Sequence, residues 1–342
     1  MNEQGISNKD YMSVKDYVRV LREKLPKDIY KPNRMRLFVL AVHILLISLY
    51  VYLILLIDNI WIELVFSVLA GYSLGLVGFL GHEILHGTVV RNRMMQNLLG
   101  GFCMFQFGLH PRVWKCWHNR QHHGNTQDPI YDPDCFGHVM LYRYSPLLRK
   151  IEKLLPGSKY IRSYFFLLYW FFLHNIIVIF YYSNNFMSKA DRIKGRIYFI
   201  VVISVWLLAA VTADTYGVLT LMIVPLMISN VLMMSHIATN HFLCPLTQEI
   251  NDPLVNSLTI RAPALIERLH LNFGYHVEHH VMPGVNPVHA RKIHKLLKEL
   301  WPDKYKEMNH IKALRLLYKT PRFYLNENTL SNPRTGEVFH TL

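Results

Sequence analysis

Residues 37–86 read LFVLAVHILLISLYVYLILLI, then DN, then IWIELVFSVLAGYSLGLVGFL, then GHEILH. The two apolar runs, 37–57 and 60–80, each have the length that a helix needs to cross a bilayer. Only Asp58 and Asn59 separate them, so the pair predicts a transmembrane hairpin. His82 and His86 follow directly and, being four residues apart, would share one face of a helix. We expect the second helix to continue into these histidines, just beyond the membrane.

A second pair of apolar runs lies at 197–212 and 217–235, separated by a short polar turn that contains Asp214. Hydrophobic residues make up 51% of the 342-residue chain. Charged residues make up only 18%, below the roughly 25% of soluble domains. The predicted fold class is therefore all-α and integral to the membrane, with four transmembrane helices in two hairpins.

Two further apolar stretches are expected to lie in the plane of the membrane. The stretch 98–109 is too short to cross. The stretch 164–182 is long enough, but basic residues flank both of its ends, and a crossing would put the last histidines on the opposite side from the others. Residues 286–320 carry apolar and basic positions at helical spacing. They predict an amphipathic helix, either at the membrane surface or packed on the rest of the protein.

The distribution of basic residues predicts which side faces the cytoplasm. Basic residues precede the first apolar run and follow the second, whereas the turn between them has none. The positive-inside rule then puts the N-terminus and every histidine-rich segment in the cytoplasm. The same rule accounts for the net charge of +14, and no basic stripe interleaved with aromatic residues indicates nucleic-acid binding. We expect a cytosolic N-terminal segment (1–36), a membrane domain with a cytosolic helical cap (37–300) and a cytosolic tail (301–342).

Eight of the nineteen histidines form three tight clusters. They are His82 and His86; His118, His122 and His123; and His276, His279 and His280. Imidazole nitrogens suit transition metals, and eight rings are too many for one ion, so the number predicts a two-metal site in the cap. On regular helices, His118 and His122 would share a face and His123 would diverge. Adjacent His279 and His280 would point about 100° apart and could serve different ions.

The first cluster also matches the HExxH pattern of zinc proteases, in which Glu83 would be the general base. A protease needs one more ligand, however, and would leave most of the other six clustered histidines without a role. A metal transporter would place its histidines along the spans, whereas these gather on one side. The many neutral nitrogens and few carboxylates favour an oxygen-activating di-iron site instead.

The clusters HEILH, HNRQHH and HVEHH, in this order around two hairpins, resemble the three histidine boxes of the membrane fatty-acid desaturase and hydroxylase superfamily. The third box, followed by Val-Met-Pro, looks most similar to acyl-lipid and sphingolipid desaturases. The resemblance covers residues 35–300. It implies two iron ions (Fe²⁺/Fe³⁺), with dioxygen as co-substrate, that introduce a double bond into the acyl chain of a lipid or acyl thioester. Hydroxylation, ketolation and oxidative decarboxylation by the same site remain alternatives.

The resemblance further implies an external electron donor, a ferredoxin or a cytochrome b5-type protein. The enzyme would be integral to the bilayer of a bacterial inner membrane or the endoplasmic reticulum, with its active site on the cytoplasmic face.

A ninth iron ligand is implied near the end of the last span. His241 is favoured over His236 because it lies nearer the cytoplasmic end. Other residues would orient the ligand rings through their far nitrogens. The candidates are Glu83, Asn125, Asp128, His236, Asn240 and Glu278. Asp132 and Asp134 follow the second box closely and are also available for this role, but a solvated acidic loop is the favoured interpretation for both.

Overall fold

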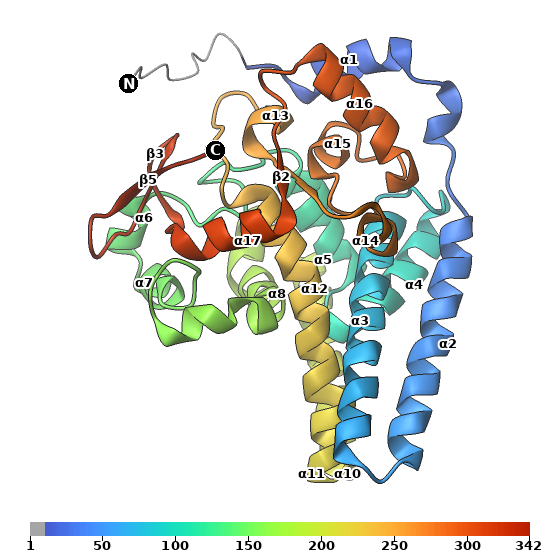
Figure 1. The fold of residues 1–342 in the computed structure, drawn as a ribbon. Coiled ribbons are helices and arrows are strands. Elements are labelled where there is room, and N and C mark those ends of the chain that lie inside the picture. Colours follow the sequence, from blue (N-terminus) through green and yellow to red (C-terminus); the bar gives the residue numbers. More distant parts are fainter. Residues whose placement is uncertain (1–10) are drawn as a thin grey trace. The chain divides into compact units, whose positions relative to one another are not determined.

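The computed structural model describes residues 11–342, most of which are helical (Figure 1). The first ten residues of the expected N-terminal segment lie outside this range. The chain divides into two compact units. The hairpin unit consists of residues 31–117 and 167–235, and the histidine unit consists of the described residues before 31 together with 118–166 and 236–342.

The helices of both predicted hairpins are present. The first hairpin consists of α2 (Met35–Leu56) and α3 (Ile60–Leu85). The second consists of α10 (Lys189–Thr212) and a run formed by α11 (Thr215–Val218), η7 (Leu219–Ile223) and α12 (Val224–His241). The polar turn residues start the following helices: the Asn59 side chain accepts hydrogen bonds from two backbone N–H groups of α3, and Asp214 accepts one from Gly217 at 2.7 Å. The predicted turns are thus helix caps.

Glycines let α3 and α12 pack closely. A Cβ atom on Gly71 would lie 2.6 Å from the carbonyl oxygen of Pro225, and one on Gly75 would lie 2.8 Å from Leu232 Cδ2. Both distances are shorter than van der Waals contact, so any larger residue would push the helices apart.

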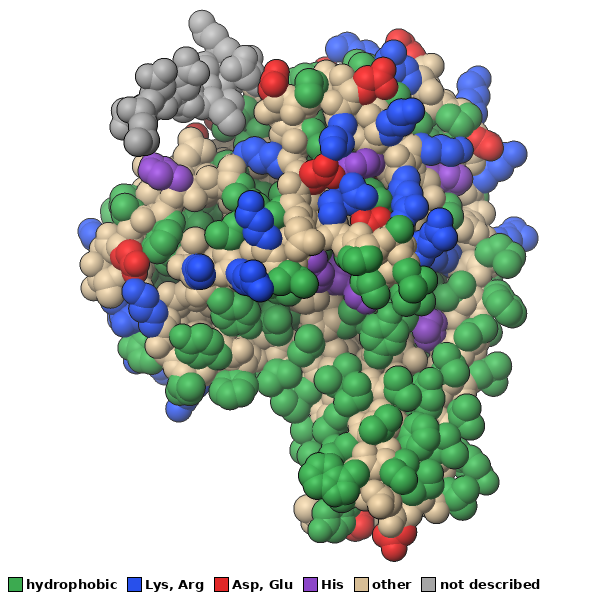
Figure 2. Space-filling view, viewed as in Figure 1, with side chains coloured by type: hydrophobic (Ala, Val, Ile, Leu, Met, Phe, Trp, Pro, Cys, Tyr) green, Lys and Arg blue, Asp and Glu red, His purple; other side chains and the backbone are tan. Residues whose placement is uncertain are grey.

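Five helices in the described part of the chain are long and apolar enough to cross a membrane. They are Met35–Leu56, Ile60–Leu85, Ile161–Phe186, Lys189–Thr212 and Thr215–His241. Only 11% of the apolar window of α2 is buried within the protein, which leaves its side chains available to lipid. Hydrophobic side chains cover the visible surface of these long helices (Figure 2).

The two stretches expected to lie in the membrane plane differ in length. The stretch 98–109 falls in α4 (Arg93–Met104) and η3 (Phe105–Phe107), and a helix of twelve residues is too short to cross. The stretch 164–182 falls in η5 (Ile161–Phe165), α8 (Phe166–Ile177) and η6 (Val178–Tyr182), which α9 (Ser183–Phe186) extends. Its in-plane orientation stays a prediction, because this helix is long enough to cross.

The histidine unit is built from shorter elements. Its helices are α1 (Val14–Lys24), η2 (Lys27–Tyr30), α6 (Val139–Tyr144), α7 (Pro146–Glu152), α13 (Pro253–Asn256), α14 (Ala264–Leu269), α15 (His276–Val281), η8 (Pro287–His289), α16 (Ala290–Leu300) and α17 (His310–Lys319). Two small sheets, which the all-α prediction omits, accompany them. Parallel β1 (Thr259–Arg261) and β2 (Glu307–Asn309) form one, and antiparallel β3 (Phe323–Asn326), β4 (Thr329–Ser331) and β5 (Val338–His340) form the other.

The predicted amphipathic helix over 286–320 is wrong as a single helix. It is broken after α16, where Pro302 follows, because proline lacks the backbone N–H that a helix interior requires. The apolar face of α16 is packed in a core: Ile293 and Leu297 are buried with Tyr17 of α1 and Val281 of α15. The helix is therefore a packed one, and its basic residues lie on the opposite, more exposed face (Figure 2).

Candidate metal centre

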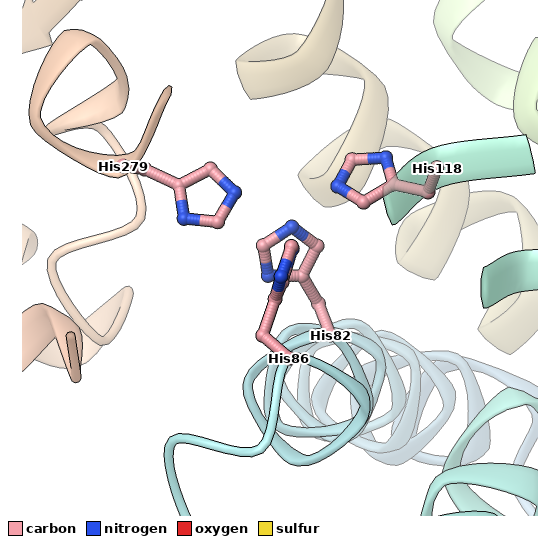
Figure 3. Close-up of side chains that lie close together, drawn as sticks. All are labelled: His82, His86, His118 and His279. Carbon is pink, nitrogen blue, oxygen red and sulfur yellow. The ribbon is translucent and has the colours of Figure 1, made fainter. Parts of the chain in front are cut away.

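The first histidine box lies at the end of α3, which runs past the predicted span to Leu85. The rings of His82 and His86 lie side by side (Figure 3), with their centroids 4.5 Å apart. Trp114 packs edge-on against both rings. Between the two histidines, Glu83 forms a buried ion pair with Arg36, at 3.0 Å. The expectation that the helix continues into the box is confirmed.

The second box lies on a π-helical segment, η4 (Lys115–His122). The backbone N–H of His123 donates to the carbonyl of His118, five residues earlier, at 3.0 Å. The wider turn brings the rings of these two residues together, with their Nε2 atoms 3.2 Å apart. The expectation that His123 diverges from His118 is therefore wrong, because it assumed 3.6 residues per turn.

The third box forms the short helix α15, whose adjacent histidines face different partners. The Nε2 atom of His279 lies 3.1 Å from that of His123, and its ring centroid lies 6.3 Å from that of His118 (Figure 3). The Nε2 atom of His280 instead lies 3.1 Å from that of His276. The offset of about 100° between consecutive helix positions produces this division, as predicted.

Four buried imidazoles meet within the histidine unit. This four-histidine group consists of His122, His241, His276 and His280, and one ring nitrogen of each lies within 4.8 Å of the others. The Nε2 atoms of His241 and His276 are 2.7 Å apart, and those of His276 and His280 are 3.1 Å apart. Nitrogens bound to one metal at about 2.1 Å would be about 3.0 Å apart at right angles and about 3.4 Å apart in a tetrahedron. The group therefore fits a single transition-metal ion.

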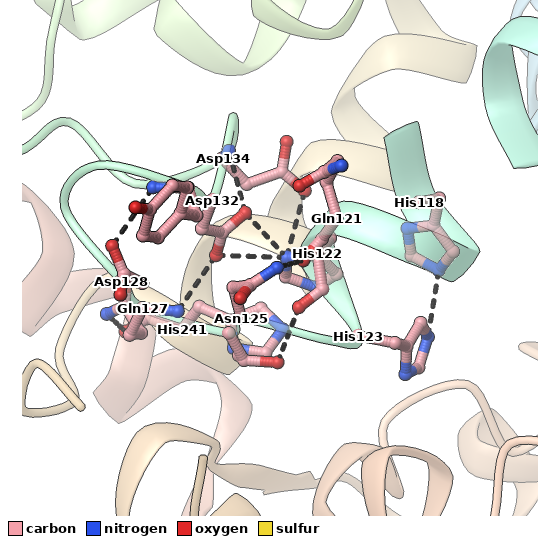
Figure 4. A network of polar contacts seen from close by, with 12 residues as sticks. His118, Gln121, His122, His123, Asn125, Gln127, Asp128, Asp132, Asp134 and His241 are labelled. Atoms are coloured by element: carbon pink, nitrogen blue, oxygen red, sulfur yellow. Dashed lines mark hydrogen bonds and ion pairs between the residues drawn. The ribbon is translucent and has the colours of Figure 1, made fainter. Parts of the chain in front are cut away.

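Acidic residues hold the far side of the His122 ring (Figure 4). Its Nδ1 lies 3.1 Å from both carboxylate oxygens of Asp132 and 3.3 Å from Asp134 Oδ2. A carboxylate only accepts hydrogen bonds, so Nδ1 carries the proton and Nε2 points into the group. The expected solvated loop is wrong for Asp132, whose side chain is only 1% exposed.

Two other rings of the group are oriented in the same way. His241 Nδ1 lies 3.1 Å from the backbone carbonyl of Asn256. His280 Nδ1 lies 3.2 Å from Thr126 Oγ1, whose hydroxyl donates to the His122 carbonyl and so can accept from the ring. Oxygen acceptors behind three rings leave three Nε2 lone pairs for a metal.

Burial and charge set the protonation of these rings. Burial lowers the pKa of His279 to about 3 and that of His280 well below the usual value, which keeps both in the neutral form that binds metals. Burial also opposes charge on His122, but Asp132 and Asp134 outweigh it and raise its pKa to about 9. These carboxylates thus make His122 more basic than His241 and His280, whose pKa values burial lowers.

Five other residues expected to orient the ligand rings lie in the histidine unit. Asp128 accepts from the backbone N–H groups of Ile130 and Tyr131, and the Asn125 side chain donates to the Gln121 carbonyl. The remaining candidates are Glu278, which contacts Thr259, Tyr305 and His294; Asn240, whose side chain is fully buried; and His236, which lies 3.3 Å from His270. The aspartates that follow the second box in the sequence indicated that a carboxylate could contact one of its rings. Which of them faces the ring depends on the loop, where Gln127 has a positive φ of 58°.

The comparisons with known proteins agree with this geometry. A family model described as "Fatty acid desaturase" matches residues 58–312, a range that contains all nine of the histidines proposed as ligands. No curated protein matches the chain. Because the matched range spans more than half of its length, the chain belongs to the fatty acid desaturase family, a family of oxidoreductases with lipid substrates.

Proposed function

We propose that the protein is a membrane di-iron desaturase that introduces a double bond into the acyl chain of a lipid or acyl thioester. The reaction converts –CH₂–CH₂–, dioxygen, two electrons and two protons into –CH=CH– and two molecules of water. The electrons come from an external donor, a ferredoxin or a cytochrome b5-type protein. Family membership supports the reaction class, and the apolar helices support a site beside a bilayer that holds the substrate.

The four-histidine group is the observation that carries the proposal. Its donors are imidazole nitrogens, which suit iron, and no cysteine takes part. Three of its rings have their Nδ1 atoms fixed by oxygen acceptors, so the nitrogens that face the metal are held before it binds. All four rings are nearly inaccessible to solvent, which keeps water away from the reacting atoms.

The second ion takes the five remaining histidines of the nine: His82, His86, His118, His123 and His279. In the histidine unit, the Nε2 atoms of His118 and His279 lie 3.2 and 3.1 Å from His123 Nε2. These distances match the separation of about 3.0–3.4 Å between two nitrogens that bind one metal. The addition of His82 and His86 rests on the three-box pattern of the sequence and on the family.

When bound, the iron pair supplies the activation of dioxygen and the removal of two hydrogen atoms from adjacent methylenes. The protein supplies the ligand geometry, the exclusion of water and the approach of the donor. The positive-inside rule puts the site on the cytoplasmic face, where basic helices such as α16 would attract an acidic donor.

The ion pair of Glu83 argues against a zinc protease. A catalytic base needs an exposed carboxylate that can take a proton from water, but the Glu83 side chain is 2% exposed and bonded to Arg36. The HExxH match is therefore better explained as part of a histidine box.

The proposal is tested by lipid analysis of cells that express the wild-type chain or one of two histidine variants. His280→Ala removes a ligand of the four-histidine group, and His340→Ala, at an exposed position on β5, is the matched control. We expect new unsaturated acyl chains with wild type and His340→Ala, and none with His280→Ala. Hydroxylated or shortened chains in their place would support one of the alternative reactions, and an unchanged lipid profile with wild type would refute the proposal.

A further inference from the structure

The helix that carries His241 ends at that residue, and its last carbonyl groups lack partners within the helix. Buried carbonyls must find other donors, because an unpaired polar group in the interior is costly. How these carbonyls are satisfied decides how firmly the His241 ring is held.

Three side chains donate to the carbonyls at this helix end. Gln127 Nε2 donates to the His241 carbonyl at 2.7 Å, Arg322 Nη1 to the Phe242 carbonyl at 2.5 Å, and the Tyr324 hydroxyl to the Cys244 carbonyl at 2.5 Å. Gln127 Nε2 also lies 2.8 Å from the Tyr324 hydroxyl. The helix end is thus fastened from the second-box loop and from the C-terminal segment together.

Arg322 is a buried cation, only 2% exposed, and forms no ion pair with any residue that the structure describes. Its other nitrogens bond to the carbonyl and hydroxyl of Thr320. A guanidinium buried without a carboxylate is unfavourable unless other negative charge compensates. The carbonyl end of α12 supplies that charge, because a helix C-terminus carries a partial negative charge. The helix end and Arg322 therefore depend on each other.

Gln127 links these contacts at the end of α12 to a second proposed ligand, His122. Its backbone N–H donates to Asp132 Oδ2 at 2.8 Å, and Asp132 holds the His122 ring (Figure 4). One hydrogen-bonded chain therefore runs from the ring of His122, through Asp132 and Gln127, to Tyr324 and the end of α12.

We propose that Arg322 and Tyr324 are positioning residues that hold His241 in place within the four-histidine group. The inference rests on the proposed metal-binding function of that group. Both residues lie beyond residue 312, where the family match ends, and in the region that the sequence pattern assigns to a cytosolic tail. The segment is nevertheless fastened at several points: Leu246 N–H donates to the Glu327 carbonyl, Leu342 N–H to the Leu243 carbonyl, and Arg334 pairs with Glu152 at 3.1 Å.

The test measures Co²⁺ binding to the full-length protein, purified in detergent and stripped of metal. The variants are Arg322→Met, Tyr324→Phe and His241→Ala, with Arg315→Met as the matched control, since it removes an exposed arginine of the same C-terminal region, on α17. We expect two Co²⁺ ions in wild type and in Arg315→Met. In Arg322→Met one of the two sites should weaken about 10- to 100-fold, as happens when the partner of a ligand is lost. Tyr324→Phe, which loses only a hydroxyl, should weaken the same site by a smaller factor.

A double-mutant cycle separates positioning of His241 from general loss of structure. If Arg322 acts through His241, then Arg322→Met in the His241→Ala background causes no further loss of affinity at that site. If Arg322→Met does not fold, the same cycle is measured with Arg322→Lys, which keeps a hydrogen-bond donor, and with Tyr324→Phe.

Two results would overturn the inference while leaving the proposed function intact. One is wild-type Co²⁺ affinity in both Arg322→Met and Tyr324→Phe when His241→Ala weakens one site. The other is a further loss of Co²⁺ affinity when Arg322→Met is added to His241→Ala, so that the losses of the two single variants multiply. A wild-type protein that binds no Co²⁺ would instead overturn the proposed function, and this inference with it.

Discussion

The Asp132 carboxylate is the clearest place to perturb the four-histidine group without removing a ligand. It lies 3.1 Å from His122 Nδ1 through both oxygens, and each oxygen also accepts a backbone N–H, from Gln127 and from Asp134. Asp132→Asn keeps the size of the side chain. It replaces the charge-assisted bond to the ring with a neutral one, and it turns an N–H group of the new amide toward one of these donors.

The cost can be worked from these contacts. A hydrogen bond to a charged group is worth about 1 kcal/mol more than a neutral one, and a buried donor left facing another donor costs at least about 1 kcal/mol. Together these effects cost about 2 kcal/mol, which corresponds to a roughly 30-fold weaker metal site. Asp134, at 3.3 Å from the same nitrogen, keeps the ring from losing its orientation altogether.

The assay is a competition titration of the metal-free protein with Zn²⁺ and a chelator. Asp128→Asn is the matched control, because the same oxygen, Oδ1, accepts both of its backbone hydrogen bonds and an asparagine retains that oxygen. We expect Asp128→Asn to bind like wild type. Equal affinities for Asp132→Asn and wild type, or an equal loss in both variants, would refute the assignment of Asp132 as the residue that orients His122.

Three further predictions concern stability. Arg36→Met leaves Glu83 buried and unpaired, so the free energy of unfolding should fall by about 3–5 kcal/mol in denaturant titrations; adding Glu83→Gln should recover part of it, and no recovery would contradict the pairing. Gly71→Ala should lower the melting temperature because its Cβ would lie 2.6 Å from the Pro225 carbonyl oxygen, whereas Gly284→Ala, with no atom within 4 Å, should leave it unchanged; equal effects would refute close packing of α3 on α12. Chelation should lower the melting temperature of wild type more than that of His280→Ala, since bound metal stabilises only the folded state; equal shifts would mean that this group holds no metal.

The hairpins and the histidine boxes could be predicted from the sequence because their signals are local. A run of about twenty apolar residues means a spanning helix whatever it packs against. The continuation of α3 into the first box follows from the same run, since no proline stands between Leu80 and His86 and the single glycine, Gly81, is tolerated within a helix. The different directions of His279 and His280, about 100° apart, need only the helical period.

The arrangements that were missed depend on contacts between distant segments. The π-helical turn that brings His118 and His123 together could not be predicted from a pattern that assumes 3.6 residues per turn. Asp132 reaches His122 because the loop turns at Gln127, and Gln127 is itself held by the end of α12 and by Tyr324. Strands of three or four residues, such as β3, carry too few positions for an alternating pattern to stand out.

The central claim is that the chain holds two iron ions through nine histidines, and metal analysis of protein purified from iron-replete cells tests it most directly. The measurement is the iron and zinc content per chain for wild type, His276→Ala and His340→Ala. The account predicts about two irons per chain in wild type and His340→Ala, and a loss of about one in His276→Ala, because His276 lies only in the four-histidine group. Zinc in place of iron, or iron content that His276→Ala leaves unchanged, would contradict it.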